Sequence, residues 1–573
     1  MATNVTWEEF VNLKTLLEKS DANLNNLKAN LDQFFLIVMG MIVYLMQGGF
    51  AFLEAGAVRS KNSTNILIKN FMDSFVAGIA YWVIGYPLAY GKGNGFIGYT
   101  FWASKDLPDT DFASFFFQYV FAATAATIVS GAMAERCEFV AYFVYSFLLT
   151  SVIYPVVTRW VWASDGWLVV GSVYGTGNDT YTIGYEDFAG SGAVHVLGGV
   201  AAFCGALLLG PRIGRFHPDT RGPVDLRGHS VPFAALGGFI LLFGFLAFNG
   251  GSALSISGDG SGASVSLSVV NTIISGSMSA FISLFIHKSG YFGNRYWSLL
   301  NALNGALTGM VAACAGCNVY YPWGAAVVGF FAAISYKLWS NIMLKLKIDD
   351  PLDATAVHFG GGLWGAIAVA FFKRDEGIVF AWDTQSGLRL AWQLTGVVSI
   401  TAWSAVLCLL MFGTLRLMGI LRVPENLERK GLDIPKHGEP AYPMESYGHG
   451  WVEHILQVLE DGRLSEVQQA IRDYKEAAVD RVVPGLLNRG YEDGTHAVGY
   501  DSMEVQVMRD GHGQKTELPS TQNLDKYRYR HPKPPAGHIL TPAVSQYTPR
   551  PNLDNGNATQ VHPVNDKHVF TAM

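Results

Sequence analysis

Eleven runs of mainly apolar residues, each about as long as a bilayer is thick, place the strongest limit on the fold of this chain. A helix needs about 20 such residues to cross the hydrocarbon core. The expected spans are 34–56, 66–90, 112–134, 138–161, 190–210, 231–253, 264–287, 297–315, 321–340, 355–372 and 392–418. Only 15% of the 573 residues are charged, against roughly 25% in soluble domains. The sequence therefore predicts an all-α polytopic membrane protein with eleven transmembrane helices in a lipid bilayer.

The basic residues predict the orientation of these helices. An odd number of spans puts the two termini on opposite sides of the membrane. With the N-terminus outside, the inner loops carry twelve Lys or Arg residues and the outer loops carry five. An excess of positive charge in cytoplasmic loops is typical of membrane proteins, so we expect an N-out, C-in topology. The polar segment 1–33 is then extracellular, and the sequons at Asn4 and Asn178 are candidate glycosylation sites.

One short phrase occurs twice, each time with a His eight residues after an Asp. Asp187 precedes His195 and Asp350 precedes His358, and each His lies in Ala-Val-His-x-x-Gly. The two phrases open spans five and ten, which predicts two inverted five-helix repeats, with the eleventh helix outside them. Both imidazoles are then expected near the midplane, where small neighbouring residues allow close helix approach. The alternative is two separate core histidines that hydrogen-bond locally.

Five separated motifs follow one another in a fixed order along residues 34 to about 445. The motifs are Phe52-Leu-Glu-Ala-Gly56-Ala-Val-Arg-Ser-Lys61-Asn62, Gly131-Ala-Met-Ala-Glu135-Arg136, the Asp187 phrase, Phe248-Asn-Gly-Gly-Ser252 and the Asp350 phrase. Together they resemble the ammonium transporter (Amt/Mep/Rh) family. Rh-type members generally lack the Trp and Ser that are present here as Trp162 and Ser252, so the chain resembles an Amt-type, eukaryotic member.

This resemblance implies a plasma-membrane homotrimer that carries ammonium or ammonia through one narrow hydrophobic pore in each subunit. It implies that His195 and His358 are the twin pore histidines. An outer recruitment site maps onto Phe121, Trp162 and Ser252, and a stacked gate maps onto Phe121 and Phe248. No enzyme activity, cofactor or metal is expected.

The residue types are suited to these implied roles. Aromatic faces attract cations, and a hydroxyl can accept a hydrogen bond from an ammonium N–H. Two neutral imidazoles can share one N–H···N bond, whereas two imidazolium ions in an apolar pore would repel each other. Potassium and ammonium have similar radii, but only ammonium can donate hydrogen bonds and give up a proton. Burying a bare cation costs on the order of tens of kcal/mol, so such a pore selects by chemistry rather than by size.

The acidic residues of the two phrases are expected to cap helices or to attract a cation. Asp187 is expected to cap the helix of span five, to attract a cation by its buried charge, or to do both. Asp350 and Asp353, at the inner entry of span ten, are expected to be helix caps. The repeated phrase therefore predicts an asymmetry, in which only the first Asp serves the substrate.

Further polar and cysteine residues in the spans are expected to lie outside the pore. Glu54, Lys69 and Asp73 are predicted to pair with other groups or to line an inner vestibule. Cys314 and Cys317 have CxxC spacing but lack a second ligand pair, so no metal site is expected there.

After the membrane domain, 34–420, the sequence changes character. Residues 421–445 are predicted to form a compact cytoplasmic regulatory segment with Gly431 and Asp433. Pro435 stands where plant relatives carry a phosphorylatable Thr, which puts that phosphoswitch in doubt, whereas the Gly431 turn that would couple the tail to the pore is retained. The tail, 446–573, is predicted to be cytoplasmic and largely disordered, with one helix near 450–480.

Two other functions compete with transport. An ammonium sensor would signal through the long tail, and a membrane enzyme would need further metal ligands beside the histidines, where Ala, Val and Gly stand. A formal net charge of −6 without a basic stripe gives no reason to expect nucleic acid.

Overall fold

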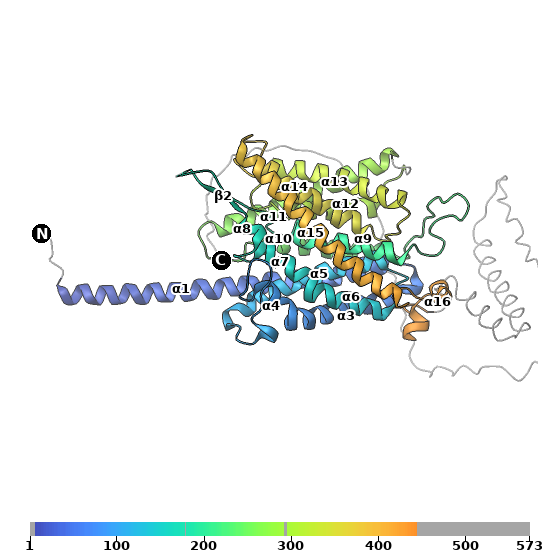
Figure 1. Ribbon diagram of the computed structural model, residues 1–573, viewed down its shortest axis with the longest axis horizontal. Helices are drawn as coiled ribbons and strands as arrows, with labels where there is room; N and C mark the ends of the chain where they lie inside the picture. Colours follow the sequence, from blue (N-terminus) through green and yellow to red (C-terminus); the bar gives the residue numbers. More distant parts are fainter. Residues whose placement is uncertain (1–5, 178, 292–294, 444–573) are drawn as a thin grey trace, which may run out of the picture. The chain divides into compact units, whose positions relative to one another are not determined.

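The structure is a computed structural model that describes residues 6–177, 179–291 and 295–443 (Figure 1). In this part of the chain, helices dominate and one short hairpin interrupts them. The α-helices are α1 (Trp7–Tyr44), α2 (Met46–Ala57), α3 (Ser63–Ala80), α4 (Tyr86–Tyr90), α5 (Phe112–Met133), α6 (Phe139–Leu148), α7 (Tyr154–Trp162), α8 (Trp167–Val170), α9 (Leu197–Leu209), α10 (Val231–Gly251), α11 (Ser261–Ser289), α12 (Leu299–Ala313), α13 (Pro322–Lys345), α14 (Gly361–Phe372), α15 (Thr384–Leu417) and α16 (Glu425–Lys430).

Shorter elements join these helices or interrupt them. Short 3-10 turns are η1 (Ser60–Asn62), η3 (Trp102–Ser104) and η4 (Asp109–Asp111). Segments of π-helix are η2 (Tyr81–Gly85), η5 (Leu149–Ile153), η6 (Ser191–Val196), η7 (Thr355–Gly360) and η8 (Asp433–His437). The strands are β1 (Ser172–Tyr174) and β2 (Tyr181–Ile183).

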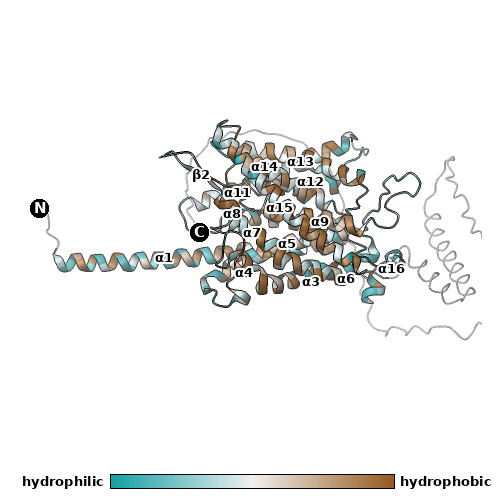
Figure 2. Cartoon of the chain, in the orientation of Figure 1, coloured by the Kyte–Doolittle hydropathy of each residue, from teal (hydrophilic) through white to brown (hydrophobic). Residues whose placement is uncertain are grey.

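Within the described residues, ten helical runs are long and apolar enough to cross a membrane. Figure 2 shows the brown, hydrophobic residues concentrated along these helices. All eleven predicted runs are helical, but the predicted span 297–315 is only the 15-residue helix α12. The chain is a multi-pass membrane protein, while the count of eleven spans remains a prediction.

The first helix begins much earlier than the predicted span at residue 34. Helix α1 starts at Trp7 and continues into the apolar run, and it ends where Leu45 separates it from α2. A capping box starts it: the Glu9 amide donates to Thr6 Oγ1 (3.3 Å), and the Thr6 amide donates to Glu9 Oε2 (2.8 Å). The polar segment before residue 34 is therefore helical from Trp7 onward.

The helical fold class is confirmed, and one short hairpin stands in the loop between α8 and η6. Strands β1 and β2 pair there as an antiparallel hairpin, with Val173 opposite Thr182. Gly171 and Gly175 have φ values of +61° and +90°, which most residues with a Cβ avoid. These glycines let the chain turn tightly in this loop, which lies outside the helices.

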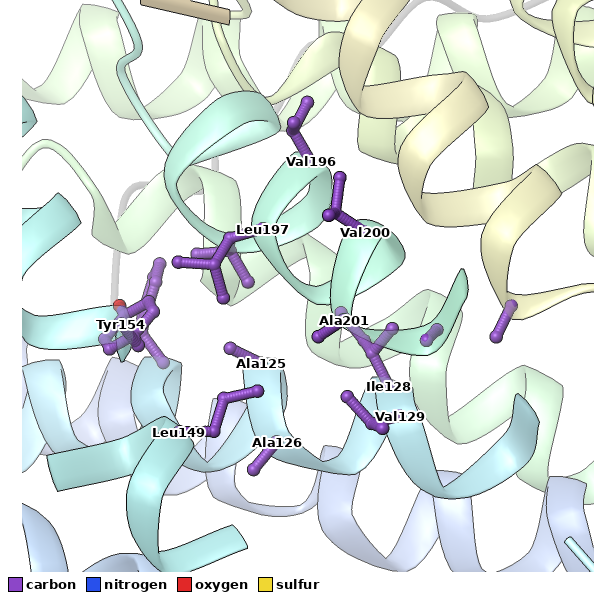
Figure 3. Close-up of a cluster of buried hydrophobic side chains, with 14 of the residues drawn as sticks. Ala125, Ala126, Ile128, Val129, Leu149, Tyr154, Val196, Leu197, Val200 and Ala201 are labelled. Atoms are coloured by element: carbon purple, nitrogen blue, oxygen red, sulfur yellow. The ribbon is translucent and has the colours of Figure 1, made fainter. Parts of the chain in front are cut away.

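Small residues let α5 and α9 pack closely at the centre of the bundle. Figure 3 shows Ala125 and Ile128 of α5 facing Leu197 and Ala201 of α9. These side chains are buried. This contact fixes α9, and with it the His-bearing segment η6 that immediately precedes it.

The two His-bearing segments also touch each other, and glycine makes this possible. A Cβ atom on Gly199 would lie 2.3 Å from the Phe359 amide nitrogen, and one on Gly362 would lie 2.4 Å from the Ser191 carbonyl oxygen. Neither position has room for a side chain, so each glycine allows the opposite segment to approach. The predicted close approach of the two His phrases is therefore confirmed.

The first and sixth predicted spans meet in a similar way. A Cβ atom on Gly237 of α10 would lie 2.1 Å from the Leu53 amide nitrogen of α2. The first span thus packs against the sixth, and the fifth span packs against the tenth. Two related sets of five helices would produce these two contacts. The inversion of the two sets remains a prediction.

An ionic cluster holds the loops at the end of the bundle opposite Trp162. Arg212 Nε donates to Asp349 Oδ2 (2.8 Å), and Arg215 Nε donates to Asp349 Oδ1 (3.1 Å). Arg136, which is fully buried, donates to the Asp349 carbonyl (2.7 Å). Burial alone would raise the pKa of Asp349, but the Arg136 and Arg212 guanidinium groups hold it well below its usual range.

We expect Asp349→Asn to lower the free energy of unfolding by about 3–5 kcal/mol, because it leaves the buried Arg212 charge short of a partner. Asp219→Asn is the matched control, since the Asp219 side chain is 88% exposed. Thermal unfolding of the two purified variants in detergent measures the difference. Equal stability of Asp349→Asn and the control would contradict the importance of this cluster.

Candidate functional site

Five rings form a continuous file through the bundle. The Phe121 ring lies 6.0 Å from the Trp162 ring, edge to face, and is stacked 4.0 Å from the Phe248 ring. Beyond Phe248, the next ring is His195 at 5.6 Å, and the His358 ring follows at 5.2 Å. The sequence-predicted gate and histidine residues are thus consecutive members of one file.

The two imidazoles face each other directly. His195 Nδ1 lies 3.1 Å from His358 Nδ1, and the planes of the two rings differ by only 16°. This geometry allows one shared hydrogen bond, with one ring as donor and the other as acceptor. His195 is fully buried, and its Nε2 atom has no hydrogen-bond partner among the described residues. The reading of two separate, locally bonded histidines is therefore wrong.

Both histidines lie in π-helical segments, η6 and η7, which periodicity did not predict. A π-helical turn shifts the hydrogen-bond register of a helix, and such turns are frequent at functional sites. Ser191 helps to hold η6, because its Oγ donates to the Val311 carbonyl (2.7 Å) and accepts from the Ala315 amide (2.9 Å). The local wall around His195 therefore includes the end of α12.

A cavity of about 140 Å³ opens at the Trp162 end of the file. The three residues predicted to recruit a cation, Phe121, Trp162 and Ser252, all line it. Ser252 Oγ donates to the Phe248 carbonyl (2.8 Å), so its lone pairs stay available to a cation donor. Other residues in the lining are Tyr90, Ser114, Phe117, Gln118, Phe188 and Leu254.

Three polar residues of this cavity, Tyr90, Ser114 and Gln118, were missed in the sequence. Gln118 Oε1 and the Tyr90 hydroxyl are buried and have no hydrogen-bond partner within the part of the chain that the structure describes. An unpartnered buried acceptor in a cavity is available to a ligand. One feature of the sequence could have indicated this site: Gln118 is a polar residue one turn before Phe121 in a mainly apolar run.

Asp187 accepts the amide hydrogen bonds at the start of η6. Its carboxylate accepts from the amides of Gly190 (3.1 Å), Gly192 (2.8 Å) and Ala193 (2.9 Å). Its backbone carbonyl also accepts a hydrogen bond from Trp162 Nε1 (2.7 Å). One residue thus ties the start of the His195 segment to the Trp162 side chain.

Asp350 is the equivalent residue of the second phrase. Its carboxylate accepts from the Ala354 amide (3.0 Å) and the Thr355 amide (2.7 Å) at the start of η7. The prediction that Asp353 also caps this helix is wrong. The Asp353 carboxylate instead accepts from the Tyr336 hydroxyl (3.0 Å) and Ser340 Oγ (3.1 Å) of the neighbouring helix α13.

A second, smaller cavity of about 30 Å³ lies on the far side of the imidazole pair. His358, Glu54 and Asn304 supply polar groups to its otherwise apolar lining. The Glu54 carboxylate accepts from Asn70 Nδ2 (2.7 Å) and from the Ser130 hydroxyl. The expected place of Glu54 in an inner vestibule agrees with this position.

The other two charged residues of the early spans have neutral partners. Lys69 Nζ donates to the Cys137 carbonyl (2.8 Å), and Asp73 Oδ2 accepts from Thr127 Oγ1 (2.6 Å). Cys314 and Cys317 are buried free thiols. Within the described residues, no group of three or more His, Cys, Asp or Glu side chains is arranged to hold a metal ion.

The segment after α15 docks on the loops and on the start of α3. Gly431 has φ +97°, and a Cβ atom there would lie 2.6 Å from Lys61 Cβ. The Leu432 amide donates to the Lys61 carbonyl (3.1 Å), and Asp433 Oδ1 accepts from the Asn65 amide (2.8 Å). Gly431 and Asp433, the two residues singled out in this segment, are thus both at the docking contact.

Docking of this segment is expected to depend on pH through Asp433. Burial raises the pKa of Asp433 to about 6, although amide hydrogen bonds oppose the shift. A carboxyl group whose pKa is higher when docked binds its proton more tightly in that state, so docking weakens as pH rises from about 4 to 6. Asp433→Asn should remove this part of the pH dependence of limited proteolysis of residues 421–443.

His229, His437 and Lys69 also face this contact, so the variant must be compared with the wild type at each pH. The pKa of His437 is lowered by burial and by Lys69. An unchanged pH profile in Asp433→Asn would assign the dependence to these other groups.

Asn4 and Asn178, the two candidate glycosylation sites, lie outside the described residues. The predicted helix near 450–480 and the rest of the 446–573 tail also lie outside them. The predicted domain boundaries remain predictions.

The fold and the file of rings define a class of protein: a multi-pass helical membrane protein with two facing imidazoles buried in its bundle. Residues 34–442 match the Ammonium Transporter Family. The chain belongs to this family, whose members are transporters or channels rather than enzymes.

Individual relatives and solved structures agree with this assignment. The chain is 49% identical to putative ammonium transporter 1 of Caenorhabditis elegans over 461 residues, which cover 77% of this chain and 85% of that protein. It is 38% identical to ammonium transporter 1 member 3 of Solanum lycopersicum over 444 residues, covering 72% and 93%.

Among solved structures, one titled "Sensor Amt Protein" matches with a TM-score of 0.65 and 32% identity, covering 72% of this chain and 100% of that chain. Mep2 of Saccharomyces cerevisiae matches with a TM-score of 0.60 and 25% identity, covering 69% and 88%. Family membership and these structures support ammonium transport across a membrane.

Proposed function

We propose that this chain is an Amt-type ammonium transporter with a twin-histidine pore in each subunit of a plasma-membrane homotrimer. The observation that carries the proposal is the His195–His358 pair, buried in an apolar file between two cavities. The Trp162 end is extracellular and the docked C-terminal segment is cytoplasmic. The distribution of basic residues along the loops supports this orientation.

Recruitment takes place in the cavity at Trp162. The faces of Trp162 and Phe121 attract an ammonium ion, and each such interaction contributes about 0.5–2 kcal/mol depending on desolvation. Ser252 Oγ accepts an ammonium hydrogen bond, and the Gln118 and Tyr90 oxygens provide further acceptors. A cation thus exchanges part of its hydration for polar groups before it meets the apolar part of the pore.

The stacked Phe121 and Phe248 rings form the gate. Their 4.0 Å separation leaves no space between them for a substrate, so a ring must rotate before the substrate passes. The next group along the file is the His195 ring, and its proximity lets a substrate exchange the aromatic contact for a hydrogen bond. A substrate that passes the gate therefore meets the imidazole pair at once.

The imidazole pair is the selective element. A neutral pair offers both an acceptor and a donor edge, and it holds at most one added proton because two imidazolium charges would repel. Ammonium can donate a hydrogen bond to the pair and transfer its proton, after which ammonia continues through the apolar segment. Potassium has no proton to donate and would have to enter this segment as a bare ion.

Reconstitution of the purified full chain in liposomes tests the transport function. An ammonium gradient should change the internal pH, read by an enclosed dye, faster than in protein-free liposomes. Trp162→Ala should slow this change several-fold at low ammonium concentration, while Trp7→Ala, outside the cavity, should leave it unchanged.

A sensor is the second candidate function, because one similar solved structure is titled "Sensor Amt Protein". A sensor would bind ammonium at the Trp162 cavity and signal through its tail without moving substrate. Binding of ammonium without flux in the liposome assay would overturn the transporter proposal and favour the sensor.

A further inference from the structure

The first part of α1 has a long apolar stripe that no other part of the described structure covers. All residues from 6 to 31 are exposed, although they belong to one continuous helix (Figure 1). Figure 2 shows brown bands of apolar residues along this otherwise teal helix. Among residues 6–177, 179–291 and 295–443, the stripe therefore has no partner.

The spacing of the stripe is that of a coiled coil. Apolar residues recur at alternating intervals of three and four, which is the a and d pattern of a heptad, and Ser20 occupies the only polar d position of the series. The a positions are Phe10, Leu17, Leu24 and Leu31, and the d positions are Leu13, Ser20, Leu27 and Phe34. The seven apolar members are 44% to 66% exposed.

The base of the helix is anchored so that this stripe remains accessible. Asp32 lies at a b position of the heptad, and its carboxylate accepts from the Ile256 amide (2.8 Å), the Ser257 amide (2.9 Å) and Ser257 Oγ (2.7 Å). These bonds hold α1 to the loop between α10 and α11. The loop therefore binds a side of α1 other than the a and d face, and the a and d face is left open.

The exposed stripe continues from this base into the first span. The next a position is Val38, which is of intermediate exposure; Met41 and Leu45 occupy the d and a positions after it, and they are 54% and 49% exposed. A Cβ atom on Gly48, the following d position, would meet no atom within 4 Å. Apart from the partly buried Val38, this face of α1 and α2 is therefore open both within the first span and beyond it.

We propose that this face packs against the same face of other copies of the chain, and that residues 10–34 form a parallel coiled coil with one helix from each subunit. The inference rests on the proposed homotrimer and supplies a contact that holds it together beyond the membrane. In a parallel arrangement, Glu9 at a g position comes opposite Lys14 at the e position of the neighbouring helix, and this is the one g–e pair of opposite charges in the series. Leu rather than Ile or Val at the a positions departs from the pattern that favours two strands.

Cysteine cross-linking tests this contact in the full chain. The five native cysteines are buried, so an introduced cysteine is the accessible thiol. Leu17→Cys and Leu24→Cys, at a positions, should give disulfide-linked dimers on mild oxidation and trimers with a three-armed maleimide. Ala22→Cys and Ala29→Cys, at f positions of the same helix, are the matched controls and should give neither.

Equal cross-linking at the a and f positions, or none at the a positions, would overturn the coiled coil. Strong quenching of probes at the a positions by lipid-borne quenchers, without cross-linking, would place the stripe on the membrane surface and would also overturn it. Ammonium flux is measured on the same preparations. Flux without cross-linking refutes only the coiled coil, whereas cross-linking without flux refutes only the transporter.

A second pair of variants measures how much the coiled coil stabilises the assembly. Leu17→Asp with Leu24→Asp should lower the temperature at which detergent-solubilised trimers dissociate by about 5 °C or more, because it places charges at two adjacent a positions. Ala22→Asp with Ala29→Asp makes the same chemical change on the opposite face and should not lower it. Equal shifts in both would contradict the assignment of the stripe.

Discussion

Replacing His195 by Ala is expected to reduce ammonium flux at least tenfold and to reduce the preference for ammonium over potassium. The variant removes one half of the imidazole pair and leaves His358 without its 3.1 Å partner. It also opens space beside the Phe248 ring, 5.6 Å away, in which water can enter the file. Water in the file would hydrate a bare cation and remove the chemical basis of selection. Flux of each cation into proteoliposomes measures both effects.

His287→Ala is the matched control for this variant. His287 is also a buried histidine in a membrane helix, but it lies in α11 and contacts Tyr296. It should therefore leave both the flux and the cation preference unchanged. If His195→Ala keeps the wild-type flux and preference, the imidazole pair is not the selective element.

The two aspartates of the repeated phrase are expected to respond differently to the same change. Asp187→Asn should lower ammonium flux about tenfold or more, whereas Asp350→Asn should leave flux within about twofold of the wild type. Asn retains one acceptor oxygen but loses the negative charge near Trp162, and it places an NH₂ group against one of three donating amides. Both variants should lower the unfolding free energy by about 0.5–2 kcal/mol, because both weaken a helix cap.

Flux at several ammonium concentrations, with thermal unfolding of the same preparations, separates the two effects. A comparable loss of flux in both variants would show that capping alone explains Asp187. The predicted asymmetry between the two phrases would then be wrong, and the buried charge would have no separate role in drawing in the cation.

Hydrophobic runs were sufficient to predict where the membrane helices lie, because the bilayer demands long apolar segments. They did not predict the π-helical segments, which depend on local contacts. Pro87 and Pro155 each stand at the second position after such a segment, and each lacks the N–H that would bond to the carbonyl four residues earlier. The helical start at Trp7 was missed because the prediction relied on mean hydropathy. Polar residues between the apolar heptad positions lower the mean hydropathy of this segment.

The repeated phrase was sufficient to predict that His195 and His358 meet, because equivalent positions of two inverted repeats are expected to converge on one axis. The gate and recruitment residues came instead from the family resemblance, and the structure places Phe121 and Trp162 together at one cavity. Gln118 could not be predicted from pattern alone. A polar residue in an apolar span can bond to its own helix, and only the three-dimensional contacts show that its Oε1 atom does not.

The most direct test of the central claim compares ammonium with potassium in liposomes that contain the wild-type chain. Ionic current and internal pH are recorded after a jump in the external concentration of each cation. The twin-histidine pore predicts a response to ammonium, as current or as internal alkalinisation, and no response to an equal jump in potassium. A potassium current comparable to the ammonium response would contradict selection by proton chemistry in the pore.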